Sequence, residues 1–323
     1  MKTFEEIIEG NKLNISDFEK FRKEQLYLLK KRVNKGLAFG LSIISISVLC
    51  SILFYNGWFI IGGVIIGIIS FFIIRGNTLV KLQNAFKERV IKSLIEEIND
   101  SFEYFPHEHI SKEDFKESQF IKFWSFFRGE DLFRGSFNGI DLEFSELHIT
   151  RKSDKTTVTV FKGPFFKIRS ENKFYGRTVV IPDRTEKILG KIGRAFQMMN
   201  FSRDRLLKID NETFENEFAV FSDQEKEAKI ILDQNLIEFL LSLKTDAKHV
   251  YFGFSKENIY LGIYNSRDLY KVNIKDEVTE QKLQSIYLEL MQNLNLSHAV
   301  YNLVQMAQKD VPDPENRFLN TNF

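Results

Sequence analysis

The chain has 323 residues, of which 28% are charged, and its formal net charge at pH 7 is +1. A charge this close to neutral excludes binding of nucleic acid through a strongly basic surface of the whole protein. Because only 5 residues are proline and 33 are phenylalanine, the composition is typical of a packed chain without a proline-rich linker. The single cysteine, Cys50, excludes an intramolecular disulfide.

Two apolar runs, residues 37–54 and 59–74, contain no charged side chain. As helices they would each span about 25 Å, enough to cross the hydrocarbon core of a bilayer. A short link from Tyr55 to Trp58 connects them, which leaves room only for a tight turn. We therefore expect a transmembrane helical hairpin over residues 37–76.

The charges beside these runs predict the orientation of the hairpin. The basic residues on its two sides are Lys20, Arg22, Lys23, Lys30, Lys31, Arg32 and Lys35 before it, and Arg75, Lys81, Lys87, Arg89 and Lys92 after it. The link between the runs has neither lysine nor arginine. By the positive-inside rule, both termini lie in the cytosol. The first run also begins too late for a cleaved signal peptide, so it predicts an uncleaved anchor.

Amphipathic segments flank the hairpin on its cytosolic side. Residues 17–35 and 79–98 both place apolar residues at helical spacing among charges. We expect an N-terminal helix within residues 1–36 and a juxtamembrane helix over residues 77–100, paired as a short stalk. The alternative is that the first helix lies on the bilayer surface, with its cations on anionic headgroups.

Small residues recur at a spacing of four in both apolar runs. Gly63 and Gly67 form a Gly-x-x-x-Gly pattern in the second run, and Ser47 and Ser51 have the same spacing in the first. Small side chains let two helices approach closely in lipid. We expect these residues to pack the hairpin. The alternative is self-association of two chains through the glycines, which would give a homo-oligomer.

Residues 101–310 are predicted to form an α+β domain with a mostly antiparallel sheet and packed helices, followed by a flexible tail at 311–323. Asn138-Gly139, between two alternating apolar runs, predicts a β-hairpin. Pro164 predicts that the strand after it is a separate strand or an edge. The other expected elements are a short helix after Ser111; strands at 131–137, 140–150, 156–161, 165–168, 177–181, 219–222, 250–254 and 259–264; and helices at 183–199, 212–217, from 223 and from 279.

Several short motifs follow one another along this domain. They are Ser111 to Phe115, Gly129 to Leu132, Gly139 to Leu147, Phe161 to Phe166, Gly176 to Asp183, Phe214 to Phe218 and Ser222 to Glu225. In their order and spacing, the chain resembles an uncharacterised bacterial membrane family, catalogued as domain of unknown function 3137. The resemblance implies a location in the bacterial inner membrane and a LemA-like membrane protein as a partner. It brings no established activity, cofactor or catalytic residue to this chain.

Two groups of residues are candidates for a catalytic or metal site. His107 and His109 would share a strand face, but no further ligands follow at a suitable spacing, so we expect a polar loop without a metal. Asp141 and Glu143 would also share a strand face, as a general acid–base pair requires, although solvated strands carry such carboxylates too. A membrane-anchored hydrolytic enzyme, the alternative function, would need this pair to converge with His107, His109 or His148.

A basic stripe lies on the helix expected at 183–199. Arg184, Lys187, Lys191 and Arg194 recur on one face of that helix. On a domain held at the inner leaflet, these cations would contact anionic lipid, and the alternative is an ordinary solvated helix face. The sequence therefore predicts a non-enzymatic membrane protein whose cytosolic domain binds a protein partner or membrane lipids, without a cofactor and without nucleic acid.

Overall fold

The computed structural model describes residues 3–99, 101–153, 156–182, 205–244, 249–265, 270 and 273–312. The chain divides into two compact units: a helical unit of Met1–Ile98 with Lys271–Ser285, and a sheet unit of Asn99–Tyr270 with Ile286–Phe323. The predicted α+β class is confirmed. The segment Lys271–Ser285 belongs to the helical unit, although it falls inside the range expected for the soluble domain.

Helix α1 (Phe4–Leu53) is continuous over 50 residues and is therefore about 75 Å long at 1.5 Å per residue. A capping box fixes its start, because Thr3 Oγ1 accepts the Glu6 N–H at 3.3 Å and the Thr3 N–H donates to Glu6 Oε2 at 2.8 Å. The expected N-terminal helix is thus the first half of α1 and not a separate element. A single glycine at the junction, Gly36, weakens a helix without ending it.

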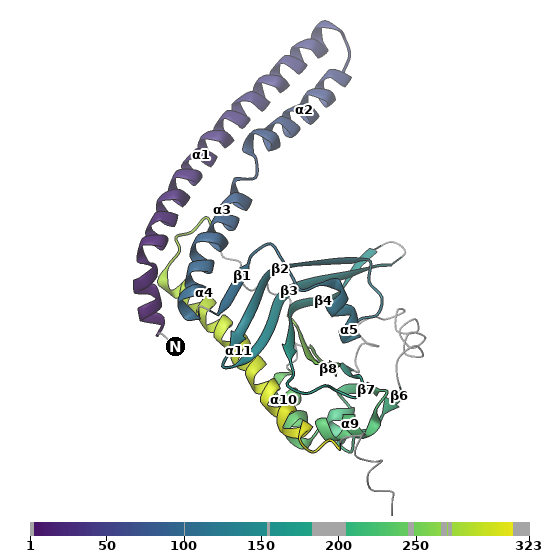
Figure 1. Ribbon diagram of the computed structural model, residues 1–323. Helices are drawn as coiled ribbons and strands as arrows, with labels where there is room; N and C mark the ends of the chain where they lie inside the picture. The colour runs from purple at the N-terminus through teal and green to yellow at the C-terminus, as the bar shows by residue number, and fades with distance from the viewer. Residues whose placement is uncertain are drawn as a thin grey trace, which may run out of the picture. The chain divides into compact units, whose positions relative to one another are not determined.

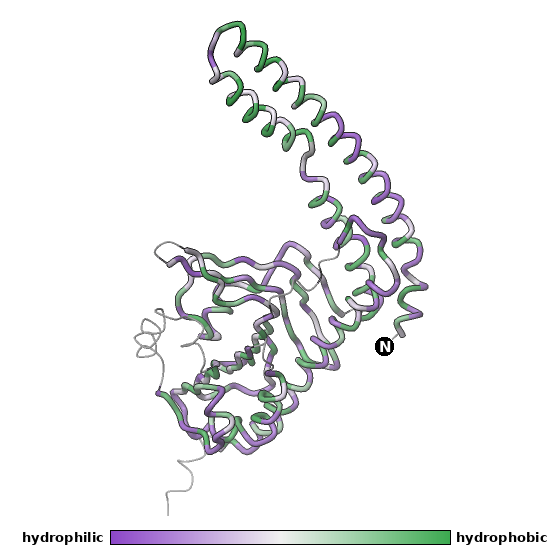
Figure 2. The backbone as a smooth tube through the Cα atoms, turned by 180° about the vertical axis from the view of Figure 1, so that it is seen from behind, coloured by the Kyte–Doolittle hydropathy of each residue, from purple (hydrophilic) through white to green (hydrophobic). Residues whose placement is uncertain are grey.

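Helix α2 (Trp58–Arg75) returns alongside α1, and the predicted two-helix hairpin is confirmed (Figure 1). Two helical stretches, Phe4–Leu53 and Trp58–Ile98, are long and apolar enough to cross a membrane. Figure 2 shows hydrophobic residues concentrated at the turn end of the hairpin and hydrophilic residues along the first half of α1. In the most apolar 18 residues of Phe4–Leu53 and of Trp58–Ile98, only 11% and 12% are buried, whereas the core helix of a soluble protein is mostly buried.

The chain bends after α2 at Gly76, which has a φ of 62°. Helix α3 (Thr78–Phe86), a π-helical turn η1 (Lys87–Ile91) and helix α4 (Lys92–Ile98) then pack against α1, which confirms the predicted stalk. The apolar core of this stalk consists of Phe4, Ile7, Phe18, Leu82, Phe86, Val90, Ile91, Leu94 and Ile95. At its centre the rings of Phe18 and Phe86 lie 5.4 Å apart.

The sheet unit contains nine antiparallel strands among the described residues, in the order β1-β2-β3-β4-β9-β8-β5-β7-β6. The strands are β1 (Phe102–Phe105), β2 (Phe126–Phe137), β3 (Ile140–Ser153), β4 (Thr156–Arg169), β5 (Thr178–Pro182), β6 (Arg205–Leu207), β7 (Phe218–Ser222), β8 (His249–Ser255) and β9 (Asn258–Tyr264). The helices are α5 (Lys112–Ser118), α8 (Glu212–Glu215), α9 (Glu225–Ile231), α10 (Gln234–Leu243) and α11 (Glu280–Gln308).

Asn138 and Gly139 form the tight turn between β2 and β3, as predicted. Their φ angles are 50° and 81°, and positive φ at both central residues is the signature of a type I′ turn. Phe137 and Ile140 are the first cross-strand pair, and the register continues to Phe126 and Thr150. This hairpin brings two of the short sequence motifs, Gly129 to Leu132 and Gly139 to Leu147, onto adjacent strands.

Several expectations about the sheet were wrong in detail. Pro164 does not divide β4, which runs on to Arg169. Pairing of β4 with β9 begins only at Phe165, so the missing N–H of Pro164 falls just outside that register. The helix expected from residue 223 is two helices, α9 and α10, because Asp233 caps a new helix by accepting the Leu236 N–H at 2.8 Å. Strands β1 and β6 were not predicted, and the helix expected at 183–199 lies outside the described residues.

One face of the sheet is covered by α5, and we call it the α5 face. Phe115 of α5 packs on Phe165 and Phe161 of β4, with ring centroids 5.1 and 6.0 Å apart. These residues are fully buried in a core that also includes Leu147 of β3 and Tyr251 of β8. The aromatic contacts explain the high phenylalanine content of this chain.

The opposite face, which we call the α11 face, has its own aromatic core. Phe144 of β3 stacks on Phe133 of β2 at 4.4 Å and packs on Phe166 of β4 at 5.3 Å. Tyr270 lies over Phe133 at 5.2 Å, and Asn293 of α11 donates to the Tyr270 hydroxyl at 3.3 Å. The part of α11 that belongs to the sheet unit therefore covers this face.

Candidate functional site

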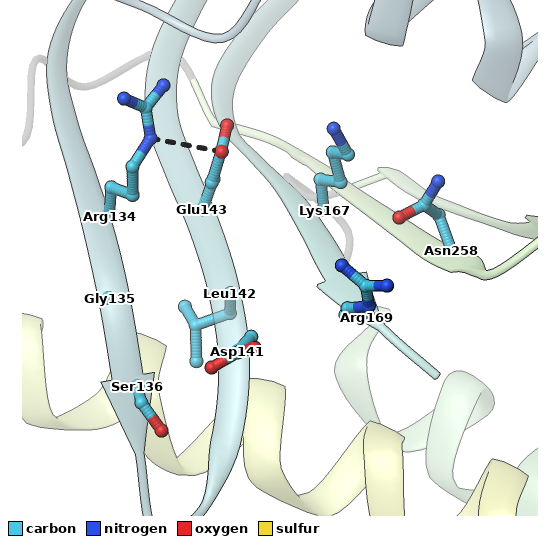
Figure 3. A pocket seen from close by; sticks show the side chains of 9 residues that line it. All are labelled: Arg134, Gly135, Ser136, Asp141, Leu142, Glu143, Lys167, Arg169 and Asn258. Carbon is cyan, nitrogen blue, oxygen red and sulfur yellow. Dashed lines mark hydrogen bonds and ion pairs between the residues drawn. The ribbon is translucent and has the colours of Figure 1, made fainter. Parts of the chain in front are cut away.

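Asp141 and Glu143 of β3 lie two residues apart and share the α5 face of the sheet. Glu143 is the cross-strand partner of Arg134 on β2 and of Lys167 on β4. These strands, with β9, border a half-open cavity of about 400 Å³, which we call the groove (Figure 3). Its lining residues are Arg134, Gly135, Ser136, Asp141, Leu142, Glu143, Lys167, Arg169 and Asn258.

The three cations of the groove are each held by a carboxylate of a neighbouring element. Arg134 Nε donates to Glu143 Oε1 at 3.0 Å, within the groove itself (Figure 3). Lys167 Nζ lies 2.7 Å from Asp114 Oδ1 of α5, and Arg169 Nη2 lies 3.4 Å from Glu257 Oε2. Arg169 is also 66% exposed, so its guanidinium remains accessible. Each cation of the groove is thus paired with a carboxylate, and the groove is open to solvent.

The histidines considered with the acidic pair lie elsewhere. His107 is exposed, and His109 packs its ring on Phe127 at 5.3 Å with Nδ1 2.8 Å from the Ile110 carbonyl. His148 is on the α11 face of β3, where Nε2 lies 3.0 Å from Thr159 Oγ1. None of the three lines the groove. Within the described ranges, no group of three or more histidine, cysteine or acidic residues is arranged to hold a metal ion.

Two of the short motifs, Gly176 to Asp183 and Ser222 to Glu225, lie beside a buried carboxylate on α9. Glu227 is 4% exposed and accepts the N–H groups of Tyr175 at 2.9 Å and Gly176 at 2.8 Å. Burial raises the pKa of Glu227 above its ordinary value, the two N–H donors lower it, and the charge of Asp223 raises it, with a net upward shift. A Cβ on Gly176 would lie 2.3 Å from Cγ of Gln224, so the loop approaches α9 as closely as a glycine allows. These contacts hold the loop at Tyr175 and Gly176 against α9, which is a structural role.

A third motif, Gly129 to Leu132, builds a β-bulge in β2. The register with β3 shifts between Glu130 and Phe133, and Asp131 between them has a φ of 59°. The buried Asp131 carboxylate accepts a hydrogen bond from the Tyr104 hydroxyl of β1. Burial and this carboxylate raise the pKa of Tyr104 well above its usual range. The motif therefore bends β2 at the bulge, where Asp131 binds Tyr104 of the edge strand β1.

The small residues of the hairpin face each other between α1 and α2. A Cβ on Gly63 would lie 2.4 Å from Cβ of Ser47, and a Cβ on Gly67 would lie 3.3 Å from the carbonyl oxygen of Gly40. Ser51 is half-buried near the end of α1. Gly40 was not predicted to take part in this packing, although it lies four residues after another glycine, Gly36, and so repeats the small-residue spacing.

The basic stripe, Arg184, Lys187, Lys191 and Arg194, lies outside the described residues.

Comparison with known proteins supports the resemblance found in the sequence. A family model described as "Protein of unknown function (DUF3137)" matches residues 159–301. Among solved structures, the chain is similar to the crystal structure of the mycobacterial trehalose monomycolate transport factor A, TtfA. The sequences are 8% identical and the TM-score is 0.27, over 62% of this chain and 90% of that chain. This likeness is too low to carry an inference about fold or function.

No curated protein matches the chain. The matched range contains the motifs from Phe161 to Phe166, from Gly176 to Asp183, from Phe214 to Phe218 and from Ser222 to Glu225. Residues 159–301 of this chain therefore match the model of the family of unknown function DUF3137.

Proposed function

We propose that this chain is a membrane-anchored, non-enzymatic interaction protein of the bacterial inner membrane. The α1–α2 hairpin crosses the bilayer, both termini lie in the cytosol, and the sheet unit presents the groove to a protein partner. A LemA-like membrane protein is the partner that the family resemblance implies. The observation that carries the proposal is the distribution of side chains around the hairpin.

The outer surface of the hairpin is mostly apolar, with the exposed serines Ser42 and Ser45 among large apolar residues. The exposed fractions of large apolar residues are 64% for Leu41, 59% for Leu49 and 52% for Ile65, while glycine and serine residues fill the space between the two helices. Keeping such a surface in water would cost about 25 cal/mol for each Å². A bilayer removes this cost. The lysines and arginines on the stalk side of both helices support the proposed orientation.

The groove supports binding more than catalysis. Its three cations are paired with Glu143 across the strands and with carboxylates of neighbouring elements, and the histidines that a hydrolytic site would use lie apart from it. A partner segment with charges of both signs would exchange these surface ion pairs for its own at little cost, because exposed ion pairs each contribute at most about 1 kcal/mol. Arg169, the most exposed cation of the groove, is the first contact that we expect.

The test is photo-crosslinking of the full-length chain in native membranes. The substitution Arg169→p-benzoylphenylalanine places the probe in the groove, and Glu238→p-benzoylphenylalanine on the exposed side of α10 is the matched control. We expect a discrete adduct with one membrane protein from position 169, absent from position 238 and lost when Glu143→Lys is added. Equal adducts from both positions, or no adduct from position 169, would contradict partner binding at the groove.

A further inference from the structure

A second exposed surface lies on the α11 face, at the end of β2 and β3 that is remote from the Asn138-Gly139 turn. Phe126 and Arg128 are two residues apart on β2, and Phe126 pairs across the strands with Thr150. Lys152 lies two residues beyond Thr150 and so shares this face. Phe127 points to the opposite face, into the core. We call these exposed residues, Phe126, Arg128 and Lys152, together with Phe123, which precedes Phe126 by three residues, the distal surface.

Two phenylalanines of the distal surface are held in solvent. Phe123 is 52% exposed and Phe126 is 50% exposed. Between and beside them, Trp124 and Phe127 pack edge-on against Phe115 at 5.5 and 5.6 Å. The exposed rings therefore belong to a segment that is anchored in the core, and their exposure is not the result of a loose loop.

Two cations lie near Phe126 on this face. Arg128 and Lys152 are exposed on the same face as Phe126, and the cross-strand neighbours of Arg128 continue the row through His148 to Lys162. Glu130 lies at the inner border of this row, toward the β-bulge. Exposed aromatic rings flanked by lysine and arginine match the headgroup region of an anionic bilayer, where rings enter the interface and cations meet phosphates.

We propose that the distal surface docks on an anionic lipid bilayer. Phe123 and Phe126 enter the headgroup region, and Arg128 and Lys152 contact lipid phosphates. Each such cation raises the affinity for an anionic surface by about fivefold. The inference rests on the proposed function, because the hairpin keeps the sheet unit close to lipid. Docking would then fix the orientation of the groove relative to the membrane.

The test uses the full-length chain with Cys50→Ala and an NBD fluorophore on Thr150→Cys, next to Phe126. The protein is reconstituted into vesicles of phosphatidylcholine, either alone or with about one third phosphatidylglycerol. The label control is Glu238→Cys on the exposed side of α10. We expect NBD fluorescence at position 150 to be at least about twofold higher in the anionic vesicles than in the neutral ones, and to be equal in both at position 238.

Two further variants separate specific docking from a general charge effect. Arg128→Gln with Lys152→Gln should abolish the difference, whereas Lys116→Gln with Lys173→Gln, which removes the same charge from other exposed sites, should retain it. Salt at about 1 M, where the Debye length is about 3 Å, should also abolish it in the unsubstituted surface.

Flotation with the vesicles distinguishes failure of this inference from failure of the proposed function. Protein that floats but shows equal fluorescence in both lipids overturns docking and leaves the anchor intact. NBD fluorescence at position 150 that is equally high in neutral lipid indicates burial against protein and overturns docking. A difference between the two lipids that persists in Arg128→Gln with Lys152→Gln also overturns docking. Protein that floats with neither lipid overturns both proposals.

Discussion

Glu19 and Arg22 form a buried ion pair in the helical unit, with Arg22 Nη2 2.7 Å from Glu19 Oε2 and with 12% and 6% of their side chains exposed. Both partners also bind the segment that precedes α11. Arg22 Nη1 donates to the Lys275 carbonyl at 3.0 Å, and the Val278 N–H donates to Glu19 Oε1 at 3.0 Å. The pair thus attaches this distant segment to α1, which explains why it belongs to the helical unit.

Removal of one partner should destabilise the helical unit. Arg22→Ala leaves the Glu19 carboxylate buried without its cation, and we expect a loss of about 3 kcal/mol in the free energy of unfolding. Lys20→Ala is the matched control, because Lys20 and Asp17 form an ion pair at 3.3 Å with the same i,i+3 spacing but are 77% and 70% exposed. Thermal unfolding of the detergent-solubilised protein should show a clearly lower midpoint for Arg22→Ala only. Equal midpoints for the two variants would contradict a role for the pair.

The same pair predicts a pH dependence. Burial alone would raise the pKa of Glu19, but the hydrogen bonds from Arg22 and Val278 and the charges of Arg22 and Lys23 outweigh it, so the pKa lies below its ordinary value. The folded state therefore holds this proton less tightly than the unfolded state. Its stabilising contribution is present above the unfolded pKa of about 4.3 and is lost as the pH falls through the folded value. The difference in unfolding free energy between the natural chain and Glu19→Gln should shrink between pH 6 and pH 3, and a constant difference would contradict this.

Glu227 should show the opposite pH dependence, because its pKa is raised. A carboxyl that binds its proton more tightly in the folded state stabilises the fold below the unfolded pKa and loses that contribution as the pH rises through the folded value. Glu227→Gln should remove this dependence. Glu227→Ala should cost about 2 kcal/mol, since the N–H groups of Tyr175 and Gly176 lose their acceptor. Lys226→Ala, at the exposed neighbouring position, should be neutral, and unfolding in urea at several pH values measures all three.

Adjacent glycines in α2 provide a test of hairpin packing. Gly63→Val places a side chain against Ser47, whereas a Cβ at Gly62 would meet nothing within 4 Å. We expect Gly63→Val to separate α1 from α2 and to lower the efficiency of a disulfide crosslink between Gly40→Cys and Gly67→Cys in a Cys50→Ala background. Gly62→Val should leave the efficiency unchanged. If the glycines instead joined two chains, Gly63→Val would spare this crosslink within one chain and remove a crosslink between chains.

Features set by neighbouring residues could be predicted from the sequence, and features set by distant contacts could not. The apolar runs and the Asn138-Gly139 turn carry their own physical signal, and so do the shared faces of Asp141 and Glu143. The continuity of β4 through Pro164 depends on where β9 begins to pair, which local composition does not reveal.

The groove could not be predicted for the same reason, because its residues meet only through contacts between distant parts of the chain. Arg134 and Lys167 are 33 residues apart in the sequence, and only the pairing of β2, β3 and β4 brings them to Glu143. The Glu227 junction joins residues that are 51 and 52 apart. By contrast, Gly40 could have been found, because its spacing from Gly36 repeats the small-residue pattern that identified Gly63 and Gly67.

The most direct test of the central claim is the accessibility of the hairpin turn in intact cells. The full-length chain with Cys50→Ala carries either Asn56→Cys in the exposed turn or Glu238→Cys in the sheet unit. We predict that a membrane-impermeant maleimide labels position 56 in spheroplasts and labels position 238 only after the membrane is permeabilised. Labelling of position 238 in intact spheroplasts, or protection of position 56 until permeabilisation, would contradict a two-span anchor with a cytosolic domain.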